Sequence, residues 1–482
     1  MILSDLLRNT SVPLPGNLAT VEITSVEEDS RNVIAGSLFV ALRGFKTDGH
    51  IHIKQALDSG AAAVLAERQI SDDNRICVNP DHDNRGILSL IAARFYNYPW
   101  EELVTVGITG TNGKTSTARM LHWVLEKHGM QSGIMGTIGH LVGGEEAQAK
   151  MTTPGALVTA GMMREMVRKG DRCCIMEVSS HALSLSRVDD VRFDAALFTN
   201  ITQDHLDFHQ SMEEYFNSKM HLFDLLKNNG TSIVGTYSDG FPSIDGAVTF
   251  GLRENDTYRV STVFGELGRI SFQLQTDGIS VPVEMSIPGK FNIFNAAGAM
   301  AAAIELGIDP ISASASLKDF PGVPGRFQSV NLGQDFLVAV DYAHTPDALE
   351  RILRQASELT ANRVITVFGA GGDRDSSKRP IMGQIADSIA DIVIITSDNP
   401  RTEDPDSIIS DITAGLSSES QSRVIVEPDR RAAIRSAISV AQTGDVVIIA
   451  GKGHEDYQIL GKKRIHFDDR EEAAAALEEV LE

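Results

Sequence analysis

The chain has 482 residues, 42% of them hydrophobic and 22% charged, and a formal net charge of −22. That length is more than one hydrophobic core fills, so about two to four domains are expected. The composition is typical of a globular protein and argues against a fibrous, disordered or membrane-spanning chain. The acidic balance disfavours nucleic acid and anionic membranes as partners, although a local cluster of cationic groups can still bind a phosphorylated small molecule.

The cysteines and the N-terminus bear on the compartment. Cys77, Cys173 and Cys174 are an odd set without a CxxC or a Cys/His metal spacing, and adjacent cysteines rarely pair, so a reducing compartment is expected. Asp5 and Arg8 come too early for a secretory signal, and no run of eighteen apolar residues predicts a transmembrane helix. We therefore predict a cytoplasmic monomer with no stable membrane insertion and no nucleic-acid partner.

The first segment, residues 1–87, has short apolar runs at 37–42 and 61–66 with turn residues between them. Runs of this length, separated by turns, predict a small α/β domain. No catalytic motif falls in this segment.

The middle segment, residues 88–322, alternates strand-like and helix-like patterns. Apolar runs of strand length occur at 103–108, 173–178 and 193–201. Such strands between helical patterns predict a mainly parallel sheet with helices on both faces. The stretch 246–287 is alternating, glycine-punctuated and β-rich, which predicts an antiparallel addition to this domain.

The last segment, residues 323–482, is predicted to be a second doubly wound α/β domain, after a hinge at 321–327 (PGVPGRF). Buried-strand runs occur at 364–368, 392–396 and 446–450. In such sheets ligands bind beyond the carboxyl ends of the strands. The turns GAGGDRD, SDNPR and GKGHE follow these three runs, so the sequence predicts a binding site there.

The strongest local signal is GTNGKT at 110–115, between a predicted strand and a predicted helix. Glycines let backbone amides approach a phosphate, and the helix N-terminus adds partial positive charge. Lys114 would reach the terminal phosphates and Thr115 would hold Mg²⁺. Strict P-loop spacing requires a glycine at position 108, where this chain has Ile108. The alternative is a glycine-rich turn without a ligand.

This loop resembles that of the Mur ligase family, and further stretches carry the resemblance along nearly the whole chain. They are MEVSSHAL around Glu177, NITQDHLDFH around His205, EEYFNSKMHLF around Lys219 and GKFNIFN at 289–295. The resemblance implies an α/β protein of three domains. These are a small N-terminal UDP-binding domain, a central P-loop ATPase domain with a mainly parallel sheet, and a C-terminal doubly wound, Rossmann-like domain.

The resemblance also implies the residues that bind ATP and Mg²⁺. The expected ATP-binding residues are Gly110, Thr111, Asn112, Gly113, Lys114, Thr115, Ser116, Asn292 and Asn295. The expected metal ligands are Thr115, Glu177, His205 and Lys219, the last in carbamylated form. The expected catalytic residues are Lys114, Lys219, His205 and Arg374, which could reach a phosphate oxygen. From the residues alone, Lys219 would be a surface lysine and Asn292 a helix cap.

The resemblance is closest to members of the family that add diaminopimelate, and it rests on DSR at 29–31 and DNPR at 398–401. Arg401 offers a planar fork for the carboxylate that distinguishes diaminopimelate from lysine. The implied diaminopimelate-binding residues are Arg374, Asp398, Asn399, Pro400, Arg401, Gly451 and Glu455. The alternative is a strand-end turn in which Arg401 pairs with an acid such as Glu403.

The implied binding residues for the UDP-muramoyl dipeptide are Ser30, Phe45, Lys46, Thr47, Thr152, Thr153, Ser179 and Arg187. Leu185 departs from the pattern, because some relatives have a glutamine there that touches the substrate.

The activity implied is an ATP- and Mg²⁺-dependent amide ligase of peptidoglycan synthesis. It would add meso-diaminopimelate to UDP-N-acetylmuramoyl-L-Ala-D-Glu through an acyl phosphate. Three alternatives remain open at this point: a lysine-adding ligase, the related folate polyglutamate ligase, and a non-catalytic nucleotide-binding module. The first domain argues against the folate enzyme, and substrate-dependent ATP turnover would exclude the binding module.

Overall fold

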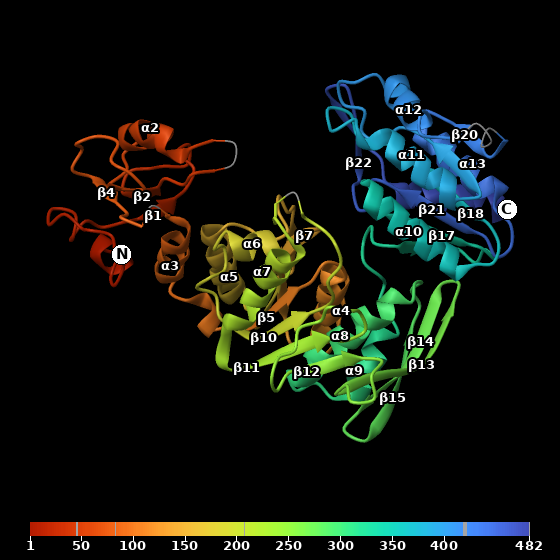
Figure 1. Ribbon diagram of the computed structural model, residues 1–482, viewed down its shortest axis with the longest axis horizontal. Coiled ribbons are helices and arrows are strands. Elements are labelled where there is room, and N and C mark those ends of the chain that lie inside the picture. The colour runs from red at the N-terminus through yellow and green to blue at the C-terminus, as the bar shows by residue number, and fades with distance from the viewer. Residues whose placement is uncertain (45–46, 82, 207, 418–421, 482) are drawn as a thin grey trace. The chain divides into compact units, whose positions relative to one another are not determined.

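The computed structural model describes residues 1–44, 47–81, 83–206, 208–417 and 422–481 (Figure 1). The chain divides into two compact units. Unit 1 contains Met1–Thr257 and Gly298–Ile308, and unit 2 contains Tyr258–Ala297 and Asp309–Glu482. The domain boundaries expected at residues 87 and 322 stay predictions, since this division follows the packing within each unit.

The N-terminal part of unit 1 is a parallel sheet in the order β1-β2-β3-β4. Its strands are β1 (Ser25–Glu27), β2 (Ser37–Val40), β3 (Ala63–Ala66) and β4 (Ile76–Val78). Its helices are α1 (Leu3–Leu6), α2 (Ile53–Asp58) and α3 (Arg85–Phe95). Successive side chains of a strand point to opposite faces. Leu38 therefore packs with α1 and α3, and Phe39 packs with α2 on the other face.

The second sheet of unit 1 has the order β12-β11-β10-β5-β9-β6-β7-β8. Its strands are β5 (Val104–Thr109), β6 (Ser132–Gly136), β7 (Gly139–Val142), β8 (Glu145–Ala147), β9 (Cys173–Glu177), β10 (Phe193–Phe198), β11 (Leu226–Gly235) and β12 (Val248–Gly251). Strands β12 to β6 are parallel, and β7 and β8 form an antiparallel edge. Its helices include α4 (Lys114–Lys127), α5 (Ala156–Lys169), α6 (Ser180–Ser184) and α7 (Met212–Asp224).

The predicted apolar runs of the middle segment are strands of this sheet. Parallel strands are buried on both faces and therefore have nearly continuous apolar sequences. Cys173 and Cys174 lie in β9 as buried free thiols, and burial raises the pKa of both. Thiols with raised pKa values are poor nucleophiles, so these cysteines belong to the core.

Helix α7 lies directly on strand β5 because of a glycine. A Cβ atom at Gly107 would be 2.9 Å from Leu222 Cδ1 and 3.0 Å from the ring of Phe193, so only glycine permits this approach. Residues three apart share a helix face, and Lys219 precedes Leu222 by that spacing. The side chain of Lys219 is therefore turned toward the strand that ends in the loop 110–113.

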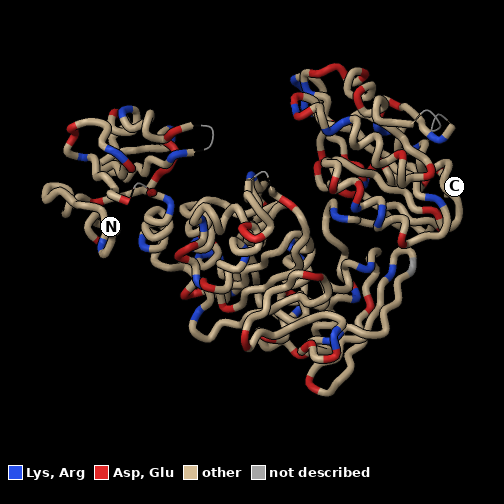
Figure 2. Tube along the Cα trace, viewed as in Figure 1, with Lys and Arg blue, Asp and Glu red and all other residues tan. Residues whose placement is uncertain are grey.

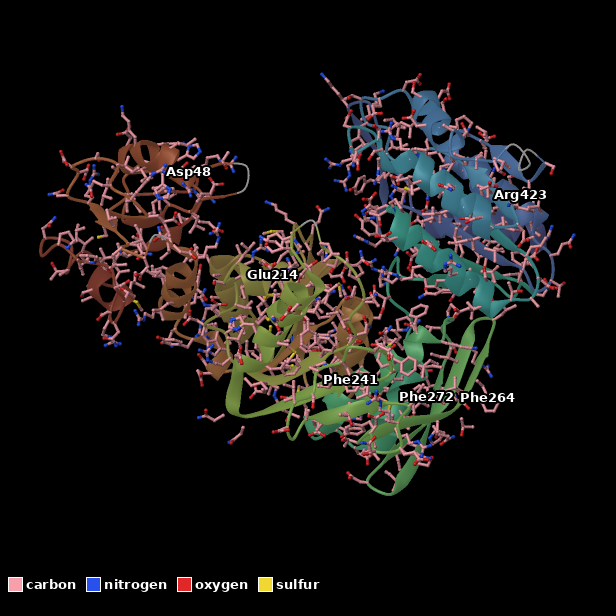
Figure 3. The ribbon with its side chains drawn as sticks, viewed as in Figure 1. Asp48, Glu214, Phe241, Phe264, Phe272 and Arg423 are labelled. Atoms are coloured by element: carbon pink, nitrogen blue, oxygen red, sulfur yellow. The ribbon has the colours of Figure 1, made fainter. Side chains whose placement is uncertain are left out.

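Unit 2 begins with an antiparallel meander of β13 (Tyr258–Glu266), β14 (Arg269–Thr276) and β15 (Ile279–Met285). Phe272 is 2% exposed and Phe264 63%, which fits strands with one buried face (Figure 3). The antiparallel prediction for 246–287 is confirmed from residue 258 on. It is wrong for β12, which pairs in parallel with β11 because it continues the parallel sheet of unit 1. Helices α8 (Phe291–Glu305) and α9 (Pro310–Leu317) follow the meander.

The C-terminal sheet has the order β16-β17-β21-β18-β19-β20 and is parallel except for β16. Its strands are β16 (Gln328–Val330), β17 (Leu337–Asp341), β18 (Val364–Phe368), β19 (Ile392–Ile395), β20 (Val424–Val426) and β21 (Val446–Ala450). The helices are α10 (Pro346–Leu359), α11 (Lys378–Ile389), α12 (Pro405–Thr413), α13 (Arg430–Val440) and α14 (Asp469–Leu481). One core lies under α10, α11 and α12 and the other under α13 and α14, so the predicted doubly wound fold is confirmed.

A short hairpin of β22 (Tyr457–Leu460) and β23 (Lys463–His466) follows the last strand of that sheet. Acidic and basic residues are interspersed along both units (Figure 2). Within the described ranges, no helix combines the length and the apolar character needed to cross a membrane.

Candidate functional site

The loop after β5 has a backbone that only glycine allows at two points. Gly110 has φ 138° and Gly113 has φ 84°. A Cβ atom at Gly110 would be 1.9 Å from Thr199 Oγ1. Thr199 Oγ1 in turn donates to the carbonyl of Asn112 at 2.6 Å. The glycines of this motif thus let the loop lie against the end of strand β10.

Asn200, just after β10, fixes the loop from the other side. The amide of Thr111 donates to the Asn200 carbonyl at 2.9 Å, and the amide of Asn112 donates to Asn200 Oδ1 at 3.0 Å. Helix α4 begins at Lys114, whose Nζ donates to the carbonyls of Gly110 and Thr111 at 2.8 and 2.9 Å. The ammonium therefore lies over the loop, where a phosphate would meet it. Ser116 is buried in the first turn of α4.

Glu177, at the end of β9, has a buried carboxylate surrounded by hydroxyl and amide donors. Thr115 Oγ1 donates to Oε2 at 2.8 Å, and Thr137 donates to Oε1 through its amide and to Oε2 through its hydroxyl, at 3.0 and 2.9 Å. The residue is 1% exposed. The Thr152 hydroxyl lies 3.1 Å from that of Thr137. Hydroxyl and carboxylate oxygens are donors that Mg²⁺ prefers, so these residues fit the ion.

Lys219 is buried on α7, at 1% exposed, so the alternative of a surface lysine is wrong. Its Nζ donates at 3.0 Å to the Gly110 carbonyl, which also accepts from Lys114. It lies 4.3 Å from the ring centre of Tyr215. Burial, and after it the charge of Lys114, holds the pKa of Lys219 well below its usual range. A lysine of this kind has an increased fraction of neutral amine.

His205 is the most exposed of the four predicted metal ligands. Its side chain is 45% exposed, and its φ is 54°. Its ring meets that of His181 edge-on at 4.8 Å and lies 6.1 Å from that of Tyr215. Two neighbouring groups thus lie at the loop: Thr115 with Glu177, and Lys219 with Tyr215. His205 lies next to the second group. The described residues contain no group of three or more His, Cys, Asp or Glu side chains placed to hold a metal.

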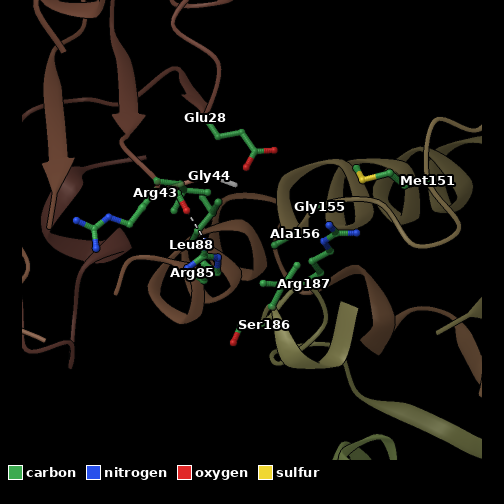
Figure 4. Close-up of a pocket in the computed structure, with 12 residues that line it drawn as sticks. Glu28, Arg43, Gly44, Arg85, Leu88, Met151, Gly155, Ala156, Ser186 and Arg187 are labelled. Atoms are coloured by element: carbon green, nitrogen blue, oxygen red, sulfur yellow. Dashed lines mark hydrogen bonds between the residues drawn. The ribbon is translucent and has the colours of Figure 1, made fainter. Parts of the chain in front are cut away.

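A cavity of about 210 Å³ in unit 1 lies beside the predicted dipeptide residues (Figure 4). It is lined by Glu28, Leu42, Arg43, Gly44, Arg85, Leu88, Met151, Gly155, Ala156, Leu185, Ser186 and Arg187. Glu28 and Arg187 extend from opposite walls in Figure 4. Burial raises the pKa of Glu28, which the charge of Arg187 partly opposes. Leu185, which stands where some relatives have a glutamine, lines this cavity with an apolar side chain.

Hydrogen bonds connect this cavity to Glu177. Arg187 Nη1 donates to the Thr153 carbonyl at 2.9 Å. Thr153 Oγ1 donates to the Glu177 carbonyl at 2.7 Å and accepts from the Ser179 amide at 3.0 Å. The structure therefore brings three of the predicted dipeptide residues into one network with the predicted metal ligand.

The remaining predicted dipeptide residues lie in the N-terminal part of unit 1. Ser30 is buried, and its hydroxyl donates to Gln55 Oε1 at 3.0 Å. Thr47 is exposed, and its carbonyl accepts from the Gly44 amide at 3.0 Å. Phe45 and Lys46 lie outside the described residues.

Asn292 and Asn295 in unit 2 share a buried face of α8, as their spacing predicts. Asn295 Nδ2 donates to Asn292 Oδ1 at 3.0 Å, and Asn292 Nδ2 donates to the Pro288 carbonyl at 2.8 Å. Both side chains thus order the start of the helix, and their contact with a nucleotide stays a prediction.

Three loops meet beyond the C-terminal sheet of unit 2, after β18, β19 and β21. Asn399 Nδ2 donates to Glu455 Oε2 at 2.9 Å, and the amide of Gly372 donates to the Asn399 carbonyl at 2.9 Å. Gly451 has φ 118°, and a Cβ atom there would lie 2.9 Å from Asp398 Oδ2. The structure therefore brings the predicted residues of DNPR and GKGHE together.

Arg401 is held by the backbone around it. Its Nη1 donates to the Gly372 carbonyl at 2.7 Å, and its amide donates to the Ile459 carbonyl at 3.1 Å. The pairing of Arg401 with Glu403 is wrong, because Glu403 Oε2 instead pairs with the buried Arg379 at 2.8 Å. A Cβ atom at Gly371 would lie 2.9 Å from Arg401 Nη1 and 3.9 Å from Arg374 Cγ, so both arginines flank this glycine. Arg374 itself is exposed.

Several residues of these sites were missed in the sequence. Thr137 follows β6, a strand that no predicted run or motif includes, whereas Asn200 is the first residue of NITQDHLDFH but was not among the predicted site residues. A polar residue directly after an apolar run is a usable signal. Lys452 lies within the GKGHE motif but was not among the predicted site residues. Arg430 is fully buried and binds Asp469 through two hydrogen bonds of 2.7 Å, and nothing in its local sequence indicates this.

Comparisons with known proteins agree with this geometry. Three family profiles match the chain. They are described as "Mur ligase family, catalytic domain" (residues 22–96), "Mur ligase middle domain" (108–303) and "Mur ligase, glutamate ligase domain" (325–453). The chain belongs to the Mur ligase family.

Two curated relatives carry the same name, UDP-N-acetylmuramoyl-L-alanyl-D-glutamate--2,6-diaminopimelate ligase. The one from Syntrophomonas wolfei is 43% identical over 99% of both chains. The one from Geobacillus kaustophilus is also 43% identical, over 95% of both chains. The family prediction is therefore confirmed along nearly the whole sequence.

Solved structures give the same result. A structure titled as this diaminopimelate ligase superposes with a TM-score of 0.69 and 31% identity, covering 95% of this chain and 96% of the other. A MurF ligase from Thermotoga maritima in complex with ADP superposes with a TM-score of 0.59 over 90% of this chain and 94% of the other. At 19% identity, the second likeness concerns the fold alone.

Proposed function

We propose that this protein is an ATP-dependent, ADP-forming ligase that adds meso-diaminopimelate to UDP-N-acetylmuramoyl-L-alanyl-D-glutamate in peptidoglycan synthesis. The full-length relatives of that name support the reaction. The choice of amino acid rests on one observation in unit 2. Asn399, two residues before Arg401 in the chain, donates a hydrogen bond to the carboxylate of Glu455.

ATP binds at the loop 110–113 and the start of helix α4. The glycines bring backbone amides close to the phosphates, and the helix N-terminus adds positive potential. Lys114 exchanges its two carbonyl partners for phosphate oxygens and stabilises the charge that develops on the transferred phosphoryl group. Asn292, Asn295 and Arg374 are further nucleotide contacts in this proposal.

Mg²⁺ is the proposed metal, held by Thr115 and Glu177 with His205 and a carbamylated Lys219. When bound, the ion neutralises phosphate charge. Carbamylation fits the environment of Lys219, because its lowered pKa leaves a neutral amine whose lone pair can attack CO₂. The nitrogen then loses a proton to solvent, and the product is an anionic carbamate beside Lys114.

The dipeptide is proposed to bind in the cavity of unit 1. Arg187 is proposed to receive an acidic group of the substrate. Its hydrogen bond to Thr153, which in turn donates to the Glu177 carbonyl, supports a position of that group near Glu177. A carboxylate oxygen of the substrate attacks the γ-phosphorus, and ADP leaves. The resulting acyl phosphate is attacked by the amino group of diaminopimelate, and phosphate leaves as the amide forms.

Recognition of diaminopimelate uses opposite charges at its far end. Arg401 provides a planar fork for the carboxylate that lysine lacks. Glu455 provides a carboxylate for the neighbouring ammonium group. Lysine would leave Arg401 without its carboxylate partner, which is the proposed basis of selection.

The test measures phosphate release from ATP with UDP-N-acetylmuramoyl-L-Ala-D-Glu and either meso-diaminopimelate or L-lysine, with the product identified by mass. Turnover with diaminopimelate and an amide product of the matching mass is expected. Turnover with lysine alone would overturn the role given to Arg401, and silence with both would overturn the ligase proposal. We also propose that the protein is cytoplasmic and monomeric, and light scattering of the purified chain tests whether it is a monomer.

A further inference from the structure

Lys452 in unit 2 is a buried lysine next to the amino-acid site. It follows strand β21, and its side chain is 0% exposed. Its Nζ donates to Glu455 Oε2 at 3.2 Å and to the Tyr457 carbonyl. A buried ammonium is stable in a protein only when it is paired and hydrogen-bonded. These contacts tie the charge of Lys452 to the segment that carries Glu455.

Glu455 is held through one of its two carboxylate oxygens. Oε2 accepts from Lys452 at 3.2 Å and from Asn399 Nδ2 at 2.9 Å. Oε1 lies 3.4 Å from the Tyr457 hydroxyl, which is a long contact. The side chain of Glu455 is 17% exposed. Two donors on Oε2 fix the carboxylate in one orientation and leave Oε1 able to accept from a ligand.

Asn399 is itself fixed, so it cannot replace Lys452. Its Oδ1 accepts from the Ile459 amide at 2.9 Å, and its Nδ2 also lies 2.9 Å from Asp398 Oδ1. That Nδ2 is thus shared between two acidic side chains. Lys452 adds a charged donor to Glu455, and charge-assisted hydrogen bonds are about twice as strong as neutral ones.

We propose that Lys452 is a positioning residue that orients the Glu455 carboxylate, so that Oε1 receives the distal ammonium of the amino-acid substrate. Lys452 acts through Glu455 and does not touch the substrate. The inference rests on the proposed function, which supplies the ammonium-bearing amino acid. The proposal makes Lys452, which follows Gly451 in the chain, a determinant of amino-acid specificity.

Removing the ammonium group of Lys452 has two opposing consequences for the KM for diaminopimelate. Its positive charge weakens the attraction of Glu455 for a second cation, so removing the charge alone would lower the KM for diaminopimelate. Its hydrogen bond keeps the carboxylate in place, so removing the bond would raise that KM. The positioning role requires the second effect to be the larger.

The experiment compares Lys452→Met, Glu455→Gln and the double variant in the full chain. The amino-acid substrates are meso-diaminopimelate and 2-aminopimelate, which keeps the reacting amino group and both carboxylates but lacks the distal ammonium. Lys318→Met is the matched control, because this lysine is exposed in the same unit. The KM values for both amino acids and for ATP are measured with kcat and the melting temperature.

We expect the KM for diaminopimelate to rise about 10-fold or more in both single variants, as for the loss of one hydrogen bond to a charged group. The double variant should be no worse than Glu455→Gln, since both changes remove one interaction. The KM values for 2-aminopimelate and ATP should change by less than about 3-fold, because neither ligand presents an ammonium to Glu455.

Three results would overturn the proposal. They are an unchanged or lowered KM for diaminopimelate in Lys452→Met, an equal rise for 2-aminopimelate, and additive effects in the double variant. If Lys452→Met is insoluble, Lys452→Gln must give the same pattern of KM values. Wild-type turnover with diaminopimelate separates this inference from the proposed function, because only failure of the wild type counts against the latter.

Discussion

Lys219 of unit 1 and Lys452 of unit 2 are both buried, at 1% and 0% exposed, but their partners differ. Lys452 is paired with the carboxylate of Glu455 at 3.2 Å. Lys219 donates to the Gly110 carbonyl and lies close enough to Lys114 for that charge to lower its pKa further. Lys452 thus has a negative charge beside it, whereas Lys219 has a positive charge beside it, which biases Lys219 toward the neutral amine.

The same contrast extends to the rest of the two sites. In unit 2, Arg430 pairs with Asp469 and Arg379 pairs with Glu403, so the buried cations hold loops in place. In unit 1, Lys114 and Lys219 share a carbonyl and would both gain from an added anion. Unit 1 is thus arranged to receive negative charge, and unit 2 to present fixed charges of both signs.

The largest expected effect is on the stability of unit 2. Arg430 donates to the carbonyls of Ala450 and Ser397, which directly precede Gly451 and Asp398. Arg430→Met leaves Asp469 buried without its partner, and this should cost about 3–5 kcal/mol in the free energy of unfolding. Urea unfolding of the full chain, followed by circular dichroism, measures the loss.

The control for that variant is Arg354→Met, which removes an exposed pair with Glu350 on helix α10. Exposed pairs at this spacing contribute about 0.3–0.5 kcal/mol, so the unfolding curve should barely move. Equal losses in the two variants would contradict the special role of the buried pair.

Next in size is the effect of Lys114→Met on catalysis. Because this ammonium is expected to stabilise charge on the transferred phosphoryl group, kcat should fall by about 10²–10³-fold. Phosphate release under saturating substrates measures the fall. Lys127→Met changes an exposed lysine at the other end of the same helix and should keep wild-type turnover. Retained activity in Lys114→Met would place phosphate binding elsewhere.

A smaller effect is expected for Arg401→Lys, which keeps the charge but removes the planar fork. The KM for diaminopimelate should rise about 10- to 100-fold, corresponding to about 1.5–3 kcal/mol for hydrogen bonds between charged groups. The KM for ATP should stay unchanged. Arg435→Lys, in an exposed pair with Glu479, is the matched control. A rise in both KM values would indicate a distorted unit rather than a lost contact.

The smallest effect is a pH dependence of stability that comes from Lys219. Its pKa is lowered in the folded chain from an ordinary value of 10.5, so between these two values the unfolded chain binds more protons. Stability contributed by this group therefore rises with pH through that window, by at most about 1.4 kcal/mol per pH unit, and the penalty is complete below the folded pKa. Because the buried thiols of Cys173 and Cys174, whose pKa values are raised, contribute the opposite trend, the rise is measured as the difference in the free energy of unfolding between the wild type and Lys219→Met, by urea unfolding in CO₂-free buffer.

Lys219→Met lacks only the contribution of this group, so the wild type should gain stability relative to the variant as the pH rises. A wild-type curve parallel to that of the variant between pH 8 and 10 would mean that Lys219 is not destabilised by its surroundings. Adding bicarbonate should then increase wild-type stability only, since the variant has no buried amine at position 219 to carbamylate.

Much of this protein was predictable because its sheets are parallel. Strands buried on both faces have continuous apolar sequences, so the runs at 103–108, 173–178 and 446–450 were recognisable as strands. The polar turns after such strands collect at one sheet edge, which placed DNPR beside GKGHE correctly. The prediction for 246–287 failed at β12, because a short strand does not indicate the direction of its neighbour.

The sequence by itself determined the α/β class, the glycine loop 110–115, the strand-end motifs and the family, since these depend on local patterns. Only the tertiary structure decided which charges meet. Lys219 was expected at the surface, but the packing of α7 on Gly107 buries it. Glu403 was expected to pair with Arg401, but it pairs with Arg379. The environment of a charge is set by residues distant in sequence, and no local pattern records them.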